Sequence, residues 1–148
     1  MLKGIHPLLT ADLLHALSGM GHGDEIAIVD ANFPATRVGR RVIELAGVSS
    51  PEALAAVLTV FPLAADEVPA ALTMQVVGDP EAVPEAVADF AVVFTDHGLA
   101  DCEIANLERH DFYARAERAA ALVRTGDLRP YGNILLVKGV VNHYEASP

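Results

Sequence analysis

The sequence predicts an α/β fold of three layers, α/β/α, with helices on both faces of a mixed or largely parallel sheet. Two observations lead to this class. Short apolar runs bounded by glycine, proline and acidic residues recur along the chain, as in strands that are buried on both faces. They alternate with amphipathic stretches of helical length. A chain of 148 residues is long enough for one core, so we assign residues 1–148 to a single domain.

The first third of the chain begins with one helix and two strands. We expect a helix over residues 10–20, with Thr10 as its N-cap and three leucines along one face. An apolar, partly β-branched run then predicts a strand over residues 25–30. Residues 31–41 are expected to form an irregular loop, and a loop of this length beside a strand end is often functional. A short strand is predicted for residues 42–45.

The middle of the chain carries two helix signals on either side of a strand. A helix is expected to start at Ser50, where a cap, a proline and a carboxylate follow one another, and to run to about Phe61. Residues 70–77 are typical of a buried strand. Residues 84–97 suit a second helix of this region, which Gly98 would close.

The last third is expected to contain two strands and one long helix. Strands are predicted over residues 103–107 and 133–137. Residues 110–125 are expected to be helical, with Gly126 as the stop, because apolar residues recur at helical spacing. These apolar residues are Phe112, Ala116, Ala119, Ala120 and Val123. The tail, residues 142–148, carries little signal and is expected to be mobile.

The composition describes an acidic and rather apolar protein. Hydrophobic residues make up 52% of the chain and the mean hydropathy is +0.34, which is high for a soluble chain of this length. We therefore expect a homo-oligomer in which other subunits cover part of the surface. The formal net charge is −10, and no predicted face gathers Lys and Arg, so neither nucleic acid nor an anionic membrane is expected as a partner.

Cysteine content and hydropathy also limit the cellular setting. Cys102 is the only cysteine, which excludes an intramolecular disulfide and a cysteine-based metal site. His6, Pro7 and Asp12 interrupt the apolar core that a signal peptide would need. No run approaches the ~20 apolar residues of a membrane span. A cytoplasmic location is the expectation that follows.

His22 is the strongest single candidate for chemistry. Glycines on both sides leave its backbone free to aim the ring into a cleft, and an imidazole exchanges a proton near neutral pH. Asp30 falls where the following strand leaves the sheet, which is where ligands bind in open α/β sheets. If Asp30 lies near His22, its carboxylate would hold one ring tautomer. The alternative is a solvated loop histidine.

Two further segments carry polar groups that suit a small polar ligand. Arg109 to Tyr113 opens the last predicted helix and brings a guanidinium, an imidazole and a phenol within about one turn. Tyr131 and Asn133 flank Gly132, which permits a tight turn, and both can hydrogen-bond a ligand. The structural alternatives are a core position for Tyr113 and a simple turn leading into the last strand.

Several catalytic classes are excluded because their motifs are missing. Six histidines are present, but none forms a His-x-x-x-His or Glu-x-x-His pattern, so no metal site is expected. The chain also lacks a phosphate loop, a dinucleotide-binding glycine pattern and a nucleophile elbow. These absences remove nucleotide hydrolysis, hydride transfer and serine hydrolase chemistry. We expect the protein to work without a cofactor.

Taken together, the motifs resemble those of the fucose mutarotase and ribose pyranase family. The resemblance runs from about Leu2 to Val140 in the family's order. It rests on Gly21–Glu25, Asp30–Pro34, Phe112-Tyr113 before Arg115-Ala116, Thr125-Gly126, Tyr131–Leu136 and Lys138–Val140. The resemblance implies the three-layer fold of that family, a ring-shaped decamer, and sites that a neighbouring subunit completes.

The resemblance also implies an activity, the interconversion of the anomers or ring forms of a free monosaccharide. It makes His22 the proton-transferring histidine and Asp30 an aspartate that contacts the sugar. Arg109 becomes a further ligand contact, and Tyr131, Gly132 and Asn133 become the sugar-binding segment. Tyr113 corresponds to a tyrosine of the fucose branch, and Asp66 sits near an acidic position of some members. Our hypothesis is that His22 transfers the main proton while the phenol of Tyr113 or Tyr131 serves as the second group.

Two departures from the family pattern leave the substrate open. Asn32 stands where fucose-type members usually carry histidine. Arg109 matches the arginine of the fucose branch, whereas His110 matches a histidine of the ribose branch. Tyr113 favours the fucose branch, so we expect a mutarotase acting on L-fucose or a related sugar. The alternatives are a ribose-type pyranase, which exchanges pyranose and furanose forms, and a noncatalytic protein that binds or senses monosaccharides.

Overall fold

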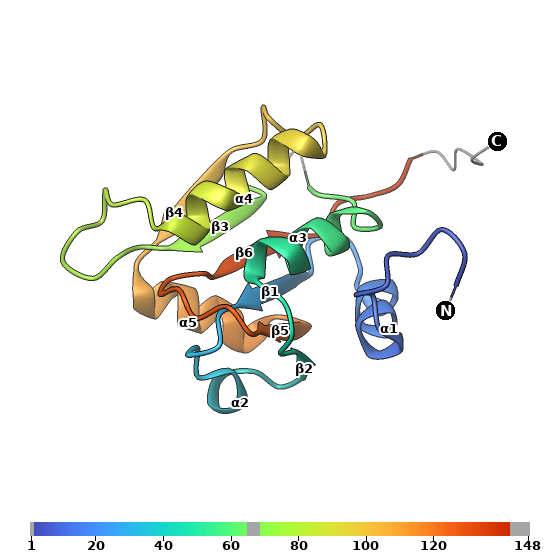
Figure 1. The fold of residues 1–148 in the computed structure, drawn as a ribbon, viewed down its shortest axis with the longest axis horizontal. Helices are drawn as coiled ribbons and strands as arrows, with labels where there is room; N and C mark the ends of the chain where they lie inside the picture. The colour runs from blue at the N-terminus through green and yellow to red at the C-terminus, as the bar shows by residue number, and fades with distance from the viewer. Residues whose placement is uncertain (1, 65–68, 143–148) are drawn as a thin grey trace.

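Residues 2–64 and 69–142 are described by the structure, a computed structural model, and they form one six-stranded sheet with helices on both faces (Figure 1). In chain order the elements are α1 (Ala11–Gly19), β1 (Glu25–Val29), α2 (Ala35–Val38), β2 (Val42–Leu45), α3 (Ser50–Leu58), β3 (Ala71–Met74), α4 (Glu85–Asp96), β4 (Ile104–Leu107), α5 (Arg109–Arg118), β5 (Ala121–Thr125) and β6 (Ile134–Val137). The expected tail lies outside the described residues from position 143 on.

The sheet is mixed, as predicted, and its topology decides which loops meet. The strand order is β2-β5-β1-β6-β3-β4. β1, β5 and β2 run parallel to one another, β3 runs parallel to β4, and β6 is antiparallel to both β1 and β3. Five strands therefore end at the same edge of the sheet at which β6 begins. Residues that follow β1, β3, β4 and β5 are thus brought next to the residues that precede β6.

Side chains of the central strands alternate between two apolar layers. Ile26 and Ile28 of β1 face the larger core, which includes Leu13 and Leu17 of α1, Leu54 of α3 and Phe90 of α4. Ala27 and Val29 face the other core, with Ala35 of α2 and Phe112 of α5. Figure 1 shows α3 and α4 on one side of the sheet and α2 and α5 on the other. This arrangement confirms the predicted three layers.

The helices begin close to the positions that their capping residues indicate. The Thr10 hydroxyl accepts a hydrogen bond from the Leu13 amide at 3.3 Å and so caps α1 as expected. The cap of α3 is Ser49 rather than Ser50, because Ser49 forms a reciprocal capping box with Glu52. This helix ends at Leu58 and not near Phe61. α4 ends as predicted, before Gly98, whose φ is +72°.

The predicted helix over residues 110–125 is wrong in its second half. α5 ends at Arg118, and residues 121–125 form β5, a fully paired strand between β1 and β2. The apolar residues from 119 to 123 fit a helical spacing, but Leu122 and Val123 are buried on opposite faces of the sheet, as in a strand. Pairing with two neighbouring strands outweighs the local pattern here. The expected loop 31–41 also contains α2, a single helical turn.

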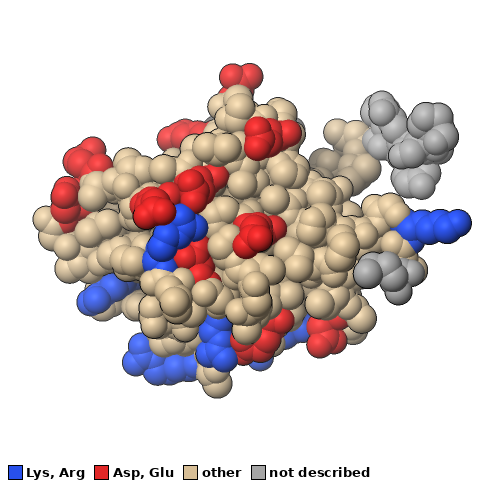
Figure 2. Space-filling model, viewed as in Figure 1, with Lys and Arg blue, Asp and Glu red and all other residues tan. Residues whose placement is uncertain are grey.

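Charged side chains are unevenly spread over the surface. On the face drawn in Figure 2, acidic side chains are scattered over the region of α3 and α4, whereas Lys and Arg gather mainly along the lower edge, on the side of α2 and α5. Within residues 2–64 and 69–142, no helix has the length and apolar character to cross a membrane.

Candidate functional site

A pocket of about 270 Å³ lies at the edge where the parallel strands end. It is lined by residues from the β1–α2 loop, the end of β3, the start of α5 and the β5–β6 loop. These residues are Asp30, Asn32, Phe33, Pro34, Met74, Arg109, Tyr113, Pro130, Tyr131 and Asn133. The volume lies just below the range of drug-sized sites, which starts at about 300 Å³, and suits a ligand of monosaccharide size.

Asp30 is the buried charged group of this pocket. Its side chain leaves β1 at the edge of the sheet, and the residue is only 4% exposed. Burial raises the pKa of its carboxyl, and hydrogen bonds, including those from the amides of Asn32 and Phe33, partly oppose that rise. Oδ1 accepts the Asn32 amide at 2.9 Å. The carboxylate is therefore held in one orientation and can accept hydrogen bonds from a ligand.

Asn133 and Gly132 hold the other side of Asp30. The Asp30 amide donates to Oδ1 of Asn133 at 2.9 Å, which leaves the Asn133 side-chain NH₂ as the group able to donate to a ligand. A Cβ built on Gly132 would lie 3.4 Å from the Asp30 Cβ and from the Ser50 Oγ. Gly132 thus backs the pocket and permits close packing of the β5–β6 loop against β1.

Arg109 brings a positive charge to the pocket. It is the first residue of α5, directly after β4, and its side chain lines the cavity. Its Nε is buried, and among the residues that the structure describes no hydrogen-bond acceptor reaches it. A buried donor without an acceptor is costly. Because the Arg109 side chain also lines the cavity, its guanidinium is a candidate donor to a ligand oxygen.

Tyr131 has a backbone conformation that a non-glycine residue seldom adopts. Its φ is +62°, in the left-handed region, which costs about 1 kcal/mol or more for a bulky side chain. The phenol oxygen accepts a hydrogen bond from the Val77 amide at 3.2 Å. The conformation turns Tyr131 into the pocket while its hydroxyl ties the β3–α4 loop to the β5–β6 loop.

The remaining wall is apolar and aromatic. Phe33 packs edge-on against Tyr113, with ring centroids 5.3 Å apart, and against Phe112 at 6.0 Å. Pro34 and Met74 complete this side of the pocket. An apolar wall that faces a buried carboxylate and an arginine matches a sugar, which has C–H groups on its faces and hydroxyls around its rim.

Most of the predicted site residues meet in this one pocket. Asp30, Arg109, Tyr113, Tyr131 and Asn133 line it. Of the two neighbours at the start of α5, the structure places Arg109 in the pocket, whereas His110 is exposed and does not line it. Asp66 lies outside the described residues. No group of three or more His, Cys, Asp or Glu side chains that could hold a metal occurs in the described part of the chain.

His22 does not share a pocket with Asp30 of its own chain. It is exposed and precedes β1, whereas Asp30 follows β1, so the two residues lie at opposite ends of a five-residue strand. At ~3.3 Å per residue, that strand alone separates them by roughly 16 Å. The hypothesis that Asp30 orients the His22 ring therefore does not hold within a single chain.

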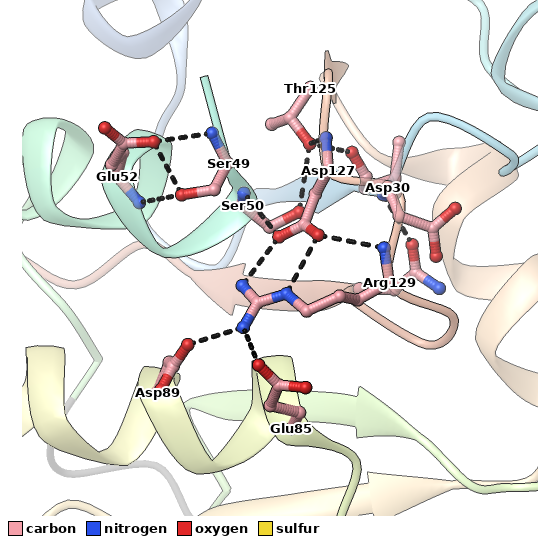
Figure 3. A network of polar contacts seen from close by, with 11 residues as sticks. Asp30, Ser49, Ser50, Glu52, Glu85, Asp89, Thr125, Asp127 and Arg129 are labelled. Atoms are coloured by element: carbon pink, nitrogen blue, oxygen red, sulfur yellow. Dashed lines mark hydrogen bonds and ion pairs between the residues drawn. The ribbon is translucent and has the colours of Figure 1, made fainter.

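The structure adds contributors that the residue patterns did not single out. Met74 and Pro130 line the pocket although each looks like an ordinary buried or turn residue in the sequence. Behind the pocket, Asp127 and Arg129 form a network with α3 and α4 (Figure 3). The signal in the sequence was the opposite charge of these two residues, spaced two apart in a turn before Tyr131.

Known proteins resemble this chain over nearly its whole length. A model of the RbsD / FucU transport protein family matches residues 3–141. The L-fucose mutarotase of Haemophilus influenzae strain 86-028NP is 40% identical over 146 residues, which cover 95% of this chain and 97% of that protein. Two solved structures are also similar. The fucose mutarotase of Streptococcus pneumoniae in complex with L-fucose has a TM-score of 0.88 at 38% identity, over 95% of this chain and 99% of that chain. FucU from Bifidobacterium longum has a TM-score of 0.84 at 39% identity, over 94% and 99%.

Proposed function

Because this chain belongs to the RbsD / FucU transport protein family, we propose that it is a sugar mutarotase that interconverts the α and β anomers of L-fucose or a closely related free monosaccharide. The observation that carries the proposal is the composition of the pocket. A buried carboxylate, Asp30, and a buried arginine Nε without an acceptor, Arg109, face an aromatic wall in a cavity of sugar size.

Mutarotation requires two proton transfers and no change of oxidation state. A proton is delivered to the ring oxygen while one is removed from the anomeric hydroxyl, the C1–O5 bond breaks, and the open aldehyde rotates and recloses. A positioned acid and base contribute ~10²-fold to 10⁴-fold to such a step. Neither a metal nor an organic cofactor enters this scheme.

The side chains of the pocket divide between holding the sugar and moving protons. Asp30 accepts hydrogen bonds from sugar hydroxyls, while Arg109 and the Asn133 NH₂ donate to sugar oxygens. The phenols of Tyr113 and Tyr131 stand at the pocket as the candidate second acid or base. A sugar that leaves any of these buried polar groups unpaired binds less well, which would give the site its selectivity.

We propose that His22 reaches this pocket from a neighbouring copy of the chain. His22 is exposed at the edge of the sheet opposite Asp30, on a loop in which Gly23 has a φ of +82°. Its position excludes it from the pocket of its own chain, so a catalytic role requires another subunit. The homodecamer implied by the family resemblance would supply that subunit, and we place the assembly in the cytoplasm.

Anomer exchange measured by NMR saturation transfer tests the function directly. The protein should speed α to β exchange of L-fucose, and His22→Ala should remove the effect. Faster pyranose to furanose exchange of ribose alone would instead support the pyranase alternative. Saturable binding of a sugar without faster exchange would identify a noncatalytic binding protein, and full activity of His22→Ala would refute the role given to His22.

A further inference from the structure

Arg129 lies at the centre of the network drawn in Figure 3, in the loop between β5 and β6. Its guanidinium binds Asp127 through two hydrogen bonds, Nε to Oδ1 at 3.0 Å and Nη2 to Oδ2 at 2.9 Å. Nη1 binds Asp89 at 2.6 Å and Glu85 at 3.2 Å, and both of these carboxylates belong to α4. The Arg129 side chain thus joins the β5–β6 loop to α4.

Asp127 fixes the near end of the same loop. Its side chain is 3% exposed, and Oδ2 accepts the Ser50 amide at 3.1 Å in the first turn of α3. Its backbone carbonyl accepts the Ala31 amide at 2.9 Å, directly after Asp30. Hydrogen bonds from Arg129 hold the pKa of the Asp127 carboxyl below its usual value, so the pair stays ionised at neutral pH.

The part of the β5–β6 loop on either side of Arg129 makes few contacts with the core. Leu128 is 79% exposed and Pro130 is also exposed, so neither residue secures the loop to the core. Tyr131 follows in its left-handed conformation, and Asn133 binds the Asp30 amide. Arg129 therefore attaches the exposed part of the loop to α4, in addition to the Tyr131 hydroxyl, which accepts the Val77 amide on the β3–α4 loop.

We propose that Arg129 is a positioning residue for sugar binding, which holds Tyr131 and Asn133 in place against Asp30 by tying the β5–β6 loop to Asp89 and Glu85. The inference rests on the proposed function, since it concerns the same pocket. Arg129 does not line that pocket, and it acts through the loop rather than by touching the sugar. The competing explanation is that the network only stabilises the fold.

Arg124 offers a matched control for that explanation. It also forms an arginine–carboxylate pair, with its Nε 3.0 Å from Glu44, but on the β5–β2 side of the sheet and outside the pocket lining. Arg129→Met and Arg124→Met each remove one guanidinium and keep an unbranched side chain. A purely structural role predicts that the two variants differ in melting temperature alone.

The experiment compares melting temperature, KM and kcat for fucose anomer exchange in the two variants and in Arg129→Lys. We expect Arg129→Met to raise KM roughly tenfold with a smaller loss of kcat, Arg129→Lys to recover part of the affinity, and Arg124→Met to keep the wild-type KM. The double variant Glu85→Gln/Asp89→Asn keeps the Asp127–Arg129 pair, so it should fold readily and shift KM in the same direction by less.

Amide hydrogen exchange adds a readout that does not depend on turnover. Residues 131–133 should exchange faster in Arg129→Met than in Arg124→Met. An unchanged KM, or unchanged exchange of these amides in Arg129→Met, would overturn the positioning role while leaving the mutarotase proposal intact. If the wild-type protein neither binds nor converts a sugar, the proposed function fails, and the role of Arg129 in sugar binding fails with it.

Discussion

The backbone amide of Asp30 donates a 2.9 Å hydrogen bond to Oδ1 of Asn133, which joins the end of β1 to the start of β6 at the floor of the pocket. The bond links residues 103 positions apart in sequence and buries both, at 4% and 3% exposure. It engages the Asn133 oxygen, so the Asn133 NH₂ is the side-chain group that serves the Asp30 carboxylate and the pocket. Recognition and fold therefore depend on the same pair of residues.

Asp30→Asn should lower the affinity for fucose without lowering the free energy of unfolding. Burial raises the pKa of Asp30, so the ionised carboxylate opposes folding, and its unfavourable contribution grows as pH rises from about 4 through the raised folded pKa. Asp30→Asn keeps the shape and an oxygen for the Asn32 amide. We expect its free energy of unfolding at pH 7 to be unchanged or higher, while its affinity for fucose falls at least ~10-fold. Chemical denaturation and calorimetric titration measure the two quantities, and an unchanged affinity would exclude Asp30 from sugar binding.

Mixed oligomers can show whether His22 acts on a neighbouring subunit. His22→Ala should be inactive alone, and Asp30→Asn should show little exchange at fucose concentrations well below its raised KM. When the two variants are produced together, about a quarter of the shared sites should combine an intact His22 with an intact Asp30. We expect anomer exchange to return to roughly that fraction of the wild-type rate. Activity that stays absent in the mixture, from two variants that each assemble normally, would refute the shared site and with it the role given to His22.

Substitutions of Arg109 and His110, neighbours at the start of α5, should differ in their effect on KM for fucose. Arg109→Ala removes the guanidinium that lines the pocket and should raise KM for fucose at least ~10-fold, because a sugar oxygen loses a charged hydrogen-bond partner. His110→Ala is the adjacent control, since His110 is exposed outside the pocket lining. Steady-state exchange rates over a range of fucose concentrations decide between them. A larger effect at His110 would shift the assignment towards the ribose branch.

The Asp127–Arg129 pair should make the effect of Arg129→Met depend on pH. The pKa of Asp127 is lowered below 3.8, so its favourable contribution is complete above that value and is lost as pH falls through the folded pKa. We expect Arg129→Met to lose about 1–2 kcal/mol of unfolding free energy at pH 7 and less below about pH 4. Arg124→Met, whose partner Glu44 is half exposed, should lose much less, because solvent screens an exposed ion pair. Urea titrations at several pH values measure the free energy of unfolding of both variants. If Arg129→Met loses the same unfolding free energy at every pH, the loss does not come from the ionised Asp127.

Local signals in the sequence accounted for most of the fold. Thr10 and Gly98 marked helix ends correctly, and the strand before Asp30 is present as predicted. β5 was missed because its apolar residues also fit the spacing of a helix, and only its two strand partners decide between the forms. Those partners are distant in sequence, so no local pattern could reveal them.

The sequence predicted several residues that line the pocket better than it predicted how the site residues are arranged in space. The resemblance to the fucose mutarotase and ribose pyranase family, which the match over residues 3–141 confirms, pointed to Asp30, Arg109 and Tyr131. The strand predicted over residues 25–30 already implied that His22 and Asp30 lie at opposite ends of it, so the hypothesis that Asp30 orients the His22 ring conflicted with that prediction. The role of Arg129 escaped prediction because its partners on α4 come together with it only in the folded chain.

The position of β1 also has a consequence for how the chain is made. β1 is synthesised early, yet both of its neighbours in the sheet, β5 and β6, follow it by about 100 residues. On the ribosome, the centre of the sheet cannot close until β5 and β6 have emerged. Until then the apolar faces of β1 stay without their partners and are exposed to aggregation. The pocket, which needs the β5–β6 loop, therefore forms only after about 100 residues beyond β1 have been added.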